Sequence, residues 1–336
     1  MSTPPVTPEP IIQVCTGLWA AGVLKGAVEL HVFDQLTTEP RDAAGLGQAL
    51  QVPSEGLQIL LDALVALEFL AHTPEGYTLT PVSAEFLVSS KPTYLGTFAA
   101  EILGDSTLYD LYSQYRRVVS DGYHRDPWEY RRGSNALVER LVRQLFILGY
   151  PVGQAIADHQ EWTAGNPTAL RMLDVGCGSA VYGLVALSRL PQARLTAQDW
   201  PHILPAAQEF AVQMGVAERV ATLAGDFRTL DFGGPYDVVF LGHILHNYDD
   251  ATNRDLVRKC VGVLAPGGRV VVVDFLAEAG EAASAFSWLF STMMYAAQGT
   301  RSWSSAEIVQ LLQDCGASRT AVGGDLPTGF VIGYRD

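Results

Sequence analysis

The sequence predicts an α/β protein in which a Rossmann-like sheet ending in an antiparallel hairpin follows a mainly helical, winged-helix-like domain. The first observation is size: the chain has 336 residues, 48% of them hydrophobic, which suffices for more than one domain with a buried core. The second is the alternation of short apolar runs with helical patterns after Pro167, which is typical of a parallel sheet covered on both faces. The third is the order of helix, helix and hairpin near the N-terminus.

The net charge and the spacing of the cysteines indicate which partners and which cellular location to expect. The formal net charge is -14, which repels phosphate backbones, so we expect no nucleic-acid partner. The four cysteines lie far apart in the sequence and form no CxxC pair, which indicates reduced thiols and a cytoplasmic protein. The first ten residues contain four prolines and no basic segment, and no uninterrupted apolar run of about 18 residues follows. We therefore expect neither secretion nor membrane insertion.

Residues 1–100 are expected to form a winged-helix-like dimerisation domain. Apolar side chains at helical spacing over 11–36, with few charges, are typical of a helix covered by a partner surface. A short helix over 43–50, a longer one over 53–70 and a hairpin over 71–87 complete the pattern. Winged helices often bind DNA, but residues 1–95 contain ten acidic side chains and only three basic ones. Homodimerisation is therefore the favoured role.

Residues 101–165 are expected to form a helical linker that contributes to the substrate pocket. The segment is rich in aromatic side chains, which line apolar pockets but more often form ordinary core. These residues are Tyr109, Tyr112, Tyr115, Tyr123, Trp128, Tyr130, Phe146 and Tyr150.

Residues 166–336 alternate strands and helices and are expected to form the catalytic domain. Strands are predicted over 171–175, 193–199, 219–225, 235–242 and 269–275, with helices over 181–190, 205–214 and 251–264 and a turn at Pro266–Gly268. Further helices are expected over 283–297 and 304–315, the second opened by a capping box from Ser304 to Glu307. Two last strands, 318–324 and 328–336, are joined by a turn at 325–327. They must pair antiparallel, because a parallel crossover needs about a dozen or more residues.

The strongest local signal is the segment Leu173–Gly178 at the end of the first strand of this region, where the ligand crevice of a doubly wound sheet opens. Gly176 and Gly178 allow a tight turn and close approach of a ligand. The next glycine is Gly183, which gives the spacing GxGxxxxG and weakens the interpretation as an NAD-dependent oxidoreductase.

Acidic residues end the next two strands. Asp199 follows Gly176 by 23 residues, where a carboxylate can accept hydrogen bonds from both ribose hydroxyls; the alternative is a helix cap before Pro201. Asp226 and Phe227 place a carboxylate beside an aromatic ring, which suits an adenine amino group and face, although Asp226 as a simple cap is the alternative.

Five segments in this order resemble the class I S-adenosylmethionine-dependent methyltransferases. They are LDVGCG, then Gln198–His202, Gly225–Phe227, Leu245–Asp250 and Leu264–Gly268. More narrowly, nearly the whole chain is similar to the dimeric small-molecule O-methyltransferases related to plant caffeate and flavonoid enzymes and to bacterial antibiotic-tailoring enzymes. The resemblance implies a seven-stranded sheet, S-adenosylmethionine as cofactor with S-adenosylhomocysteine as product, a homodimer and a role in secondary metabolism.

The resemblance also implies roles for individual residues. Asp174, Gly176 and Gly178 match the glycine loop beside the methionine moiety, Asp199 the ribose acid, Trp200 and Phe227 the residues flanking adenine, and Asp226 the acid near its amino group. His246 matches the general base, and Asp274 falls where the family has an acid that orients it. The chemistry is consistent, because a phenol of pKa about 10 reacts poorly while protonated and an imidazole of pKa about 6.5 is suited to accept its proton.

The chain departs from the family at two places. Gly242 stands where the family has a lysine that contacts the cofactor, and Gly299–Trp303 replaces the segment with a second catalytic glutamate. Arg301 in that segment either contacts an anionic substrate group or is solvated. His243 and His246 with Asp249 and Asp250 also have a spacing compatible with metal ligands. We expect no metal there, because the segment begins at a strand end rather than within a long helix.

The sequence thus predicts a cytoplasmic homodimer that methylates a hydroxyl of an apolar, aromatic small molecule, with His246 as base and Asp274 as its orienting acid. Three alternatives remain open: a carbon or nitrogen acceptor methylated by positioning alone, an NAD-dependent oxidoreductase, and a non-catalytic regulator that retains the cofactor fold.

Overall fold

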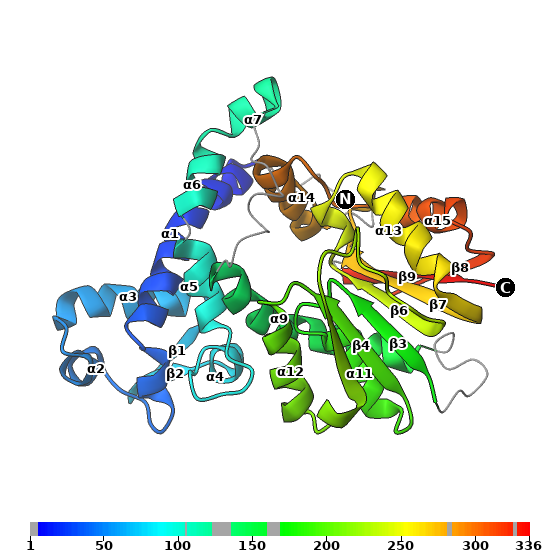
Figure 1. Cartoon of the computed structure of the whole chain (residues 1–336). Coiled ribbons are helices and arrows are strands. Elements are labelled where there is room, and N and C mark those ends of the chain that lie inside the picture. Colours follow the sequence, from blue (N-terminus) through cyan, green and yellow to red (C-terminus); the bar gives the residue numbers. More distant parts are fainter. Residues whose placement is uncertain (1–5, 105, 123–135, 160–168, 281–283, 325–327) are drawn as a thin grey trace, which may run out of the picture. The chain divides into compact units, whose positions relative to one another are not determined.

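The computed structural model describes residues 6–104, 106–122, 136–159, 169–280, 284–324 and 328–336. It divides into two compact units, Met1–Ser106 and Thr107–Asp336, and Figure 1 colours the first of them blue to cyan. Three of the predicted pocket aromatics, Tyr123, Trp128 and Tyr130, and the predicted turn at 325–327 lie outside the described residues.

The first unit has the predicted order of helices and hairpin. Its elements are α1 (Glu9–Glu29), the 3-10 helix η1 (Phe33–Leu36), α2 (Ala43–Leu50), α3 (Ser54–Ala66), β1 (Leu70–Thr73), β2 (Gly76–Leu79), α4 (Pro81–Phe86) and α5 (Gly96–Gly104). The two strands pair antiparallel, and the buried leucines of α2 and α3, Leu46, Leu61 and Leu64, form the core. The single helix predicted over 11–36 is wrong in its last part. His31 adopts a left-handed backbone conformation, φ 56°, which ends the helix before η1 begins.

The α1 helix leaves most of its apolar surface exposed. Only Ala27 and Val28 are buried, whereas Val14 and Trp19 are 82% and 71% exposed. By length and composition alone α1 is also apolar enough to cross a membrane, a test that core helices of soluble proteins and signal sequences pass as well. An exposed apolar surface of this extent is typical of an interface with another protein chain or with a membrane.

The second unit contains a seven-stranded sheet, as predicted. Its strands are β3 (Arg171–Val175), β4 (Arg194–Asp199), β5 (Val220–Ala224), β6 (Tyr236–Gly242), β7 (Leu264–Phe275), β8 (Arg319–Gly323) and β9 (Thr328–Tyr334), in the order β5-β4-β3-β6-β7-β9-β8. The first five strands pair parallel, and β9 pairs antiparallel with both β7 and β8. The strand order reverses between β3 and β6, which is the place where ligands bind in such sheets.

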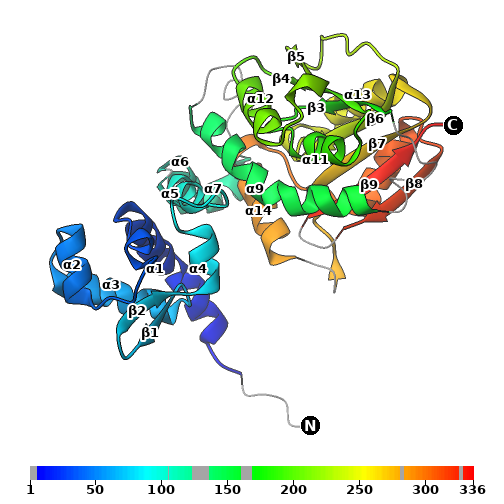
Figure 2. The same cartoon turned by 90° about the horizontal axis from the view of Figure 1, so that it is seen from below.

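The helices of this unit are α6 (Ser106–Ser113), α7 (Tyr115–Asp121), α9 (Ala136–Asp158), α11 (Val181–Arg189), α12 (Leu204–Gln213), α13 (Asp250–Gly262), α14 (Ala285–Gln298) and α15 (Ser305–Asp314). Among them, α11 and α12 cover one face of the sheet and α13 and α15 cover the other (Figures 1 and 2). Successive residues of β3 point to opposite faces: Met172 packs in the core with α11, and Leu173 packs in the core with α13 and α15. Burial on both faces explains why these strands are continuous apolar runs.

One predicted feature of this unit is wrong and one is confirmed. Pro266–Gly268 was expected as a turn before the strand, but it lies inside β7. Tyr236 pairs with Leu264 and Val238 with Arg269, so the extra residues of β7 bulge from the ladder, with Gly267 at a φ of 75°. The capping box of Ser304 with Glu307 is present at the start of α15.

Candidate active site

The loop after β3 is held by residues at the end of β4. Gly176 and Gly178 have φ values of 61° and 55°, which a residue with a side chain adopts only with strain. The Gly176 amide donates a hydrogen bond to Gln198 Oε1 at 3.2 Å, and the Gly178 amide donates to Asp199 Oδ2 at 2.8 Å. The loop therefore keeps a fixed shape at the carboxyl edge of the sheet, where a ligand can approach its backbone.

Asp174 lies beneath this loop. Its side chain is 1% exposed, and Oδ2 accepts a hydrogen bond from the amide of Gly183 at 3.4 Å. Burial, with a further contribution from Asp199, raises the pKa of Asp174 well above its usual range. Asp174 thus binds the start of α11 from inside the protein rather than offering an exposed carboxylate. Gly183 allows this close packing, because a Cβ there would lie 2.8 Å from the side chain of Leu195.

Asp199 connects the end of β4 to the glycine loop. Besides its contact with Gly178, its Oδ1 accepts a hydrogen bond from the amide of Trp200 at 2.7 Å. Asp199 is not a helix cap, since α12 begins at Leu204 and its N-cap is Ile203. These two hydrogen bonds fix the carboxylate at the edge where the ligand crevice opens. Each carboxylate oxygen can accept more than one hydrogen bond, so both can also accept from a ligand.

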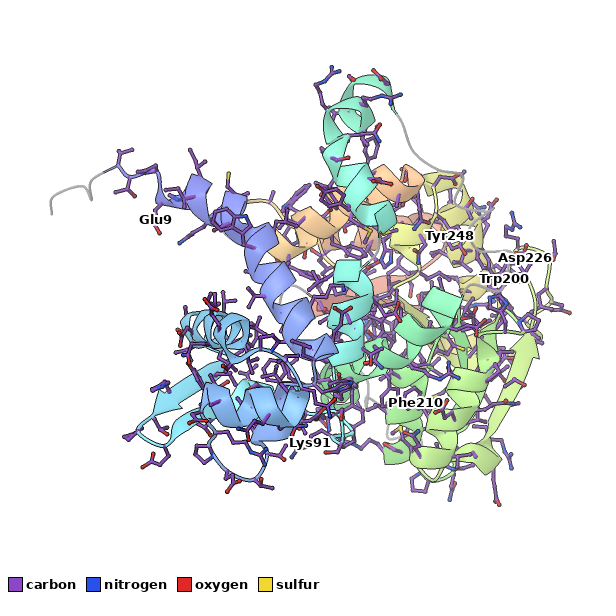
Figure 3. All side chains as sticks on the ribbon, turned by 90° about the vertical axis from the view of Figure 1, so that its left-hand side faces the viewer. Glu9, Lys91, Trp200, Phe210, Asp226 and Tyr248 are labelled. Carbon is purple, nitrogen blue, oxygen red and sulfur yellow. The ribbon has the colours of Figure 1, made fainter. Side chains whose placement is uncertain are left out.

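Asp226 and Phe227 form part of the same edge, and Figure 3 labels Trp200, Asp226 and Tyr248 in one region of this unit. Asp226 is held by Arg228, whose Nε lies 2.9 and 3.0 Å from its two carboxylate oxygens, and it caps no helix. Phe227 is 7% exposed, and its ring meets the ring of Tyr248 edge-on at 5.1 Å. Tyr248 belongs to the motif Leu245–Asp250, and its contact with Phe227 forms only in the tertiary structure.

His246 and Asp274 form a buried pair. His246 lies in the 3-10 helix η3 (Leu245–Asn247), and its Nδ1 is 2.6 Å from Asp274 Oδ1. The amide of Phe275 donates to the same oxygen at 2.8 Å, and the amide of His246 faces Oδ2 at 3.4 Å. Burial alone would raise the pKa of Asp274, but the facing rings of His246 and His243 outweigh it and hold the pKa well below its usual range. An ionised Asp274 keeps a proton on His246 Nδ1 and leaves Nε2 free to accept one.

His243 faces the same carboxylate. Its Nδ1 lies 3.6 Å from Asp274 Oδ1, too far for a hydrogen bond, and its backbone has a φ of 52°. The acids that the sequence suggested as its metal-ligand partners are elsewhere. Asp249 accepts a hydrogen bond from the amide of Thr252 as the N-cap of α13, and Asp250 is the exposed first residue of that helix. The spacing along the chain did not identify Asp274 as the acid shared by the two histidines.

Phenylalanine rings surround the His246–Asp274 pair. Phe290 meets the His246 ring edge-on at 4.9 Å, and Phe275 lies 4.8 Å from Phe290 and 5.0 Å from Phe286. Phe286 and Phe290 both lie on α14, the helix that the sequence predicts over 283–297. Such rings lower the local dielectric and exclude water from the pair.

Tyr182 occupies the space beside Gly242. A Cβ at Gly242 would overlap ring carbons of Tyr182. The Tyr182 hydroxyl is buried and has no hydrogen-bond partner among the described residues, and burial raises the pKa of Tyr182 above its usual range. A large aromatic side chain from α11 thus fills the space beside Gly242, a contact that the helical pattern over 181–190 does not indicate.

Arg301 has partners within its own segment. Its guanidinium lies 2.9 Å from Glu307 and 4.8 Å from the ring centre of Trp303. Its side chain is 44% exposed, as expected of a solvated arginine, and the contact with an anionic substrate group stays a prediction.

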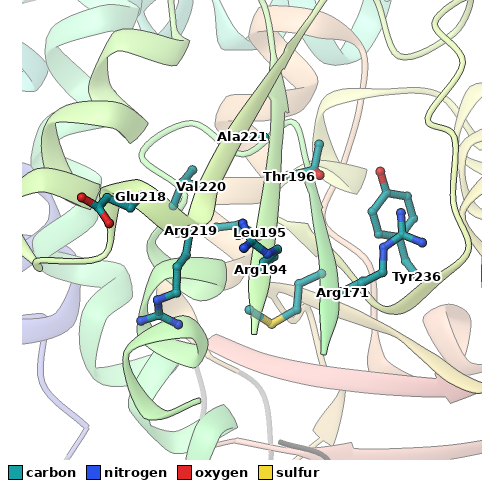
Figure 4. Close-up of a pocket in the computed structure, with 10 residues that line it drawn as sticks. Arg171, Arg194, Leu195, Thr196, Glu218, Arg219, Val220, Ala221 and Tyr236 are labelled. Atoms are coloured by element: carbon teal, nitrogen blue, oxygen red, sulfur yellow. The ribbon is translucent and has the colours of Figure 1, made fainter. Parts of the chain in front are cut away.

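A separate hollow of about 240 Å³ lies at the amino ends of β3, β4 and β6 (Figure 4). Arg171, Arg194, Arg219 and Tyr236 contribute to its lining. The Arg219 guanidinium donates hydrogen bonds to the backbone carbonyls of Leu187 and Leu190. Because parallel strands have their carboxyl ends at the opposite edge, this hollow is remote from His246 and Asp274.

Comparison with known proteins agrees with this geometry. Residues 166–318 match the family model of the O-methyltransferase domain, and residues 12–89 match that of the O-methyltransferase dimerisation domain. A 3-hydroxy-5-methyl-1-naphthoate 3-O-methyltransferase from Streptomyces sahachiroi is 27% identical over 94% of this chain and 92% of that protein. The acetylserotonin O-methyltransferase of Mus musculus is 30% identical over 92% of this chain and 83% of that protein. A Nostoc punctiforme protein solved as a candidate O-methyltransferase superposes with a TM-score of 0.87 at 26% identity, over 98% of this chain and 100% of that one.

The contact between Gly242 and Tyr182 generates a prediction about stability. We expect Gly242→Ala to lower the free energy of unfolding by about 1 to 3 kcal/mol, because the added methyl group overpacks a buried ring. Adding Gly242→Ala to a Tyr182→Ala background should cost much less, so that the two changes couple. Urea unfolding of the four proteins of this cycle measures the coupling, and strictly additive effects would contradict the assigned contact. Gly262→Ala, with nothing within 4 Å of the new Cβ, is the matched control and should not destabilise.

Proposed function

Because this chain belongs to the O-methyltransferase family, we propose that it transfers a methyl group to a hydroxyl of an apolar, aromatic small molecule, with His246 as general base. The chain is an enzyme, and S-adenosylmethionine is its methyl donor. The observation that carries the proposal is the 2.6 Å separation between His246 Nδ1 and the buried carboxylate of Asp274. The family methylates small molecules, whereas the aromatic character of the acceptor and the identity of the base are our inferences from the site.

The residues at the carboxyl edge of the sheet fit the methyl donor. Gly176 and Gly178 keep side chains away from the loop, and the carboxylate of Asp199 is suited to accept hydrogen bonds from ribose hydroxyls. We assign Trp200 and Phe227 to the faces of adenine and Asp226 to its amino group, with Asp174 beside the methionine moiety and bonded to the first turn of α11. When bound, S-adenosylmethionine would supply a methyl group carried on a positively charged sulfur. The carbon of that methyl group is the atom that an oxygen nucleophile would attack.

His246 and Asp274 supply the proton transfer. The ionised Asp274 holds the Nδ1 proton of His246, so that Nε2 would accept the proton of the acceptor hydroxyl. The hydroxyl oxygen would form its bond to the methyl carbon as the bond between that carbon and sulfur breaks, with S-adenosylhomocysteine as the leaving group. The carboxylate then stabilises the imidazolium, by the logic of the Ser-His-Asp triad. The phenylalanine rings beside His246 favour an apolar, aromatic acceptor and exclude water. The described helices of residues 107–158 are our candidates for the remaining wall of this pocket.

The general-base role predicts a loss of turnover without a loss of cofactor binding. His246→Gln should lower turnover by about 10² to 10⁴ while the affinity for S-adenosylhomocysteine stays nearly unchanged. Because the pKa of Asp274 is held well below its usual range, Asp274 stays ionised between pH 6 and pH 9. The loss should shrink at high pH, where a phenolic acceptor ionises unaided. Asp274→Asn should act in the same direction but less strongly, since the imidazole remains.

The measurement is the rate of labelled methyl transfer from S-adenosylmethionine to a panel of aromatic hydroxyl compounds between pH 6 and pH 9. Wild-type turnover by His246→Gln throughout that range would exclude the base. It would favour catalysis by positioning alone, including transfer to a carbon or nitrogen acceptor. Mass spectrometry of the products identifies the methylated atom.

The assignment of Asp199 predicts a loss of cofactor affinity. Asp199→Ala removes an acceptor of charged hydrogen bonds, at a cost of about 1.5 to 3 kcal/mol, so S-adenosylhomocysteine should bind at least about tenfold more weakly. Isothermal titration calorimetry measures the affinity. Asp231→Ala is the control, because Asp231 is exposed and caps a nearby turn at Gly233. Equal affinities of wild type and Asp199→Ala would rule out the ribose site.

We also propose that the enzyme is a cytoplasmic homodimer whose partner surface covers α1. The dimerisation family match over 12–89 and the exposed apolar side chains of α1 support this assembly, and the net charge of -14 argues against nucleic acid as a partner. Burial of α1 against a second chain also accounts for its hydropathy without a membrane.

The homodimer predicts a mass of two chains in light scattering. Trp19→Glu should shift the equilibrium toward monomer, because it places a charge in the apolar surface of α1, where Trp19 is 71% exposed. Val212→Glu, at an equally exposed position on α12 of the other unit, should leave the mass unchanged. A monomeric wild type that stays soluble would refute the dimer, and binding to lipid vesicles that Trp19→Glu abolishes would favour a membrane surface as the cover instead.

A further inference from the structure

Three possible metal ligands converge at the active site. His243, His246 and Asp274 each offer one ligand atom, and these atoms lie within 4.8 Å of one another. His243 Nδ1 is 3.6 Å and His246 Nδ1 is 2.6 Å from Asp274 Oδ1. Two ligands bound to one tetrahedral Zn²⁺ at about 2.0 to 2.2 Å are separated by about 3.3 to 3.6 Å. The distance from His243 Nδ1 to Asp274 Oδ1 already has this value, and an ion that binds all three ligand atoms brings the other two distances into the same range.

His243 adds a third possible ligand atom to the pair of His246 and Asp274. Its Nδ1 is buried and makes no hydrogen bond with the described residues. Its backbone is left-handed, and the amide of His243 donates a hydrogen bond to the carbonyl of Val273 at 2.8 Å, which fixes this conformation. The ring packs 4.4 Å from Phe275, which holds it toward the carboxylate. An oriented nitrogen without a partner, next to a buried carboxylate, is a feature that a bound cation satisfies.

The surroundings of Asp274 meet the further requirements of such a site. The amides of Phe275 and His246 face its two oxygens and fix the carboxylate, as outer-shell groups do in metal sites. Phenylalanine rings limit the access of water. Two imidazoles and one carboxylate form a ligand set that suits Zn²⁺ and leaves a fourth position for water.

We propose that His243, His246 and Asp274 bind Zn²⁺ and that the bound ion reversibly stops methyl transfer. Zn²⁺ on His246 Nδ1 takes the lone pair of that nitrogen, so the proton that Nδ1 carried moves to Nε2. A protonated Nε2 has no lone pair with which to accept the proton of the acceptor hydroxyl. The inhibition therefore rests on the proposed role of His246 as base, whereas the binding of the ion does not.

The binding is tested by titrating the full chain, first freed of metal with a chelator, with ZnCl₂ in a calorimeter. The wild type should bind Zn²⁺, and His243→Phe, which keeps an aromatic ring against Phe275 but removes the ligand atom, should bind at least about a hundredfold more weakly. The control is His31→Phe, because His31 and Asp34 are the partners of an exposed pair at 3.2 Å in the other unit. That variant should bind as the wild type does. Absence of binding, or equal binding by wild type and His243→Phe, overturns the site.

The inhibition is tested in the methyl-transfer assay, with each rate divided by the rate of the same protein in excess chelator. Zn²⁺ should lower the relative rate of the wild type and of His31→Phe by about tenfold or more at saturation, and the chelator should restore it. His243→Phe should be insensitive over the same range. A wild type that binds Zn²⁺ at full activity overturns the inhibition. Because the calorimetry needs no acceptor, a failure of the metal site is distinguishable from a failure of the proposed O-methylation.

Discussion

The parallel pairing of β6 with β7 is the constraint on which the active site depends. Gly242 lies opposite Val273 in this pair, so the residues that follow β6 meet the end of β7 at one edge of the sheet. The pairing brings His246 and Asp274 into contact although 28 residues separate them in the chain. A shift of this register by one residue would turn Asp274 to the other face of the sheet and break the pair. The buried apolar residues on both faces of β6 and β7 fix that register.

Two buried carboxylates at this edge have opposite electrostatic environments. Asp174 faces a single backbone amide and the nearby charge of Asp199, so its pKa is raised. Asp274 is equally buried but faces two imidazoles, so its pKa is lowered. The contrast shows that the neighbours of these two carboxyl groups, rather than their burial, decide the protonation state.

Close packing and open hydrogen-bonding capacity lie side by side at the end of β6. The ring of Tyr182 fills the space beside Gly242, so no side chain fits there without movement. His243 follows directly, and its buried Nδ1 faces Asp274 at 3.6 Å without a hydrogen bond to the described residues. Side-chain differences at such positions alter which groups contact a ligand without altering the sheet.

The sequence by itself determined the elements, their order and the pair at the centre of the site. Apolar runs, glycines and caps act over a few residues, so the strands from 171 to 275 and the capping box at Ser304 were predictable from local pattern. The spacing from Gly176 singled out Asp199, and the family resemblance singled out His246 and Asp274, which the structure places in contact. Only the tertiary structure decided which side chains share a neighbour: the approach of Tyr182 to Gly242, the pairing of Arg301 with Glu307, and the choice of Asp274 rather than Asp249 as the acid beside His243. These contacts join elements that are far apart along the chain, and no local period or spacing encodes the packing of one element against another.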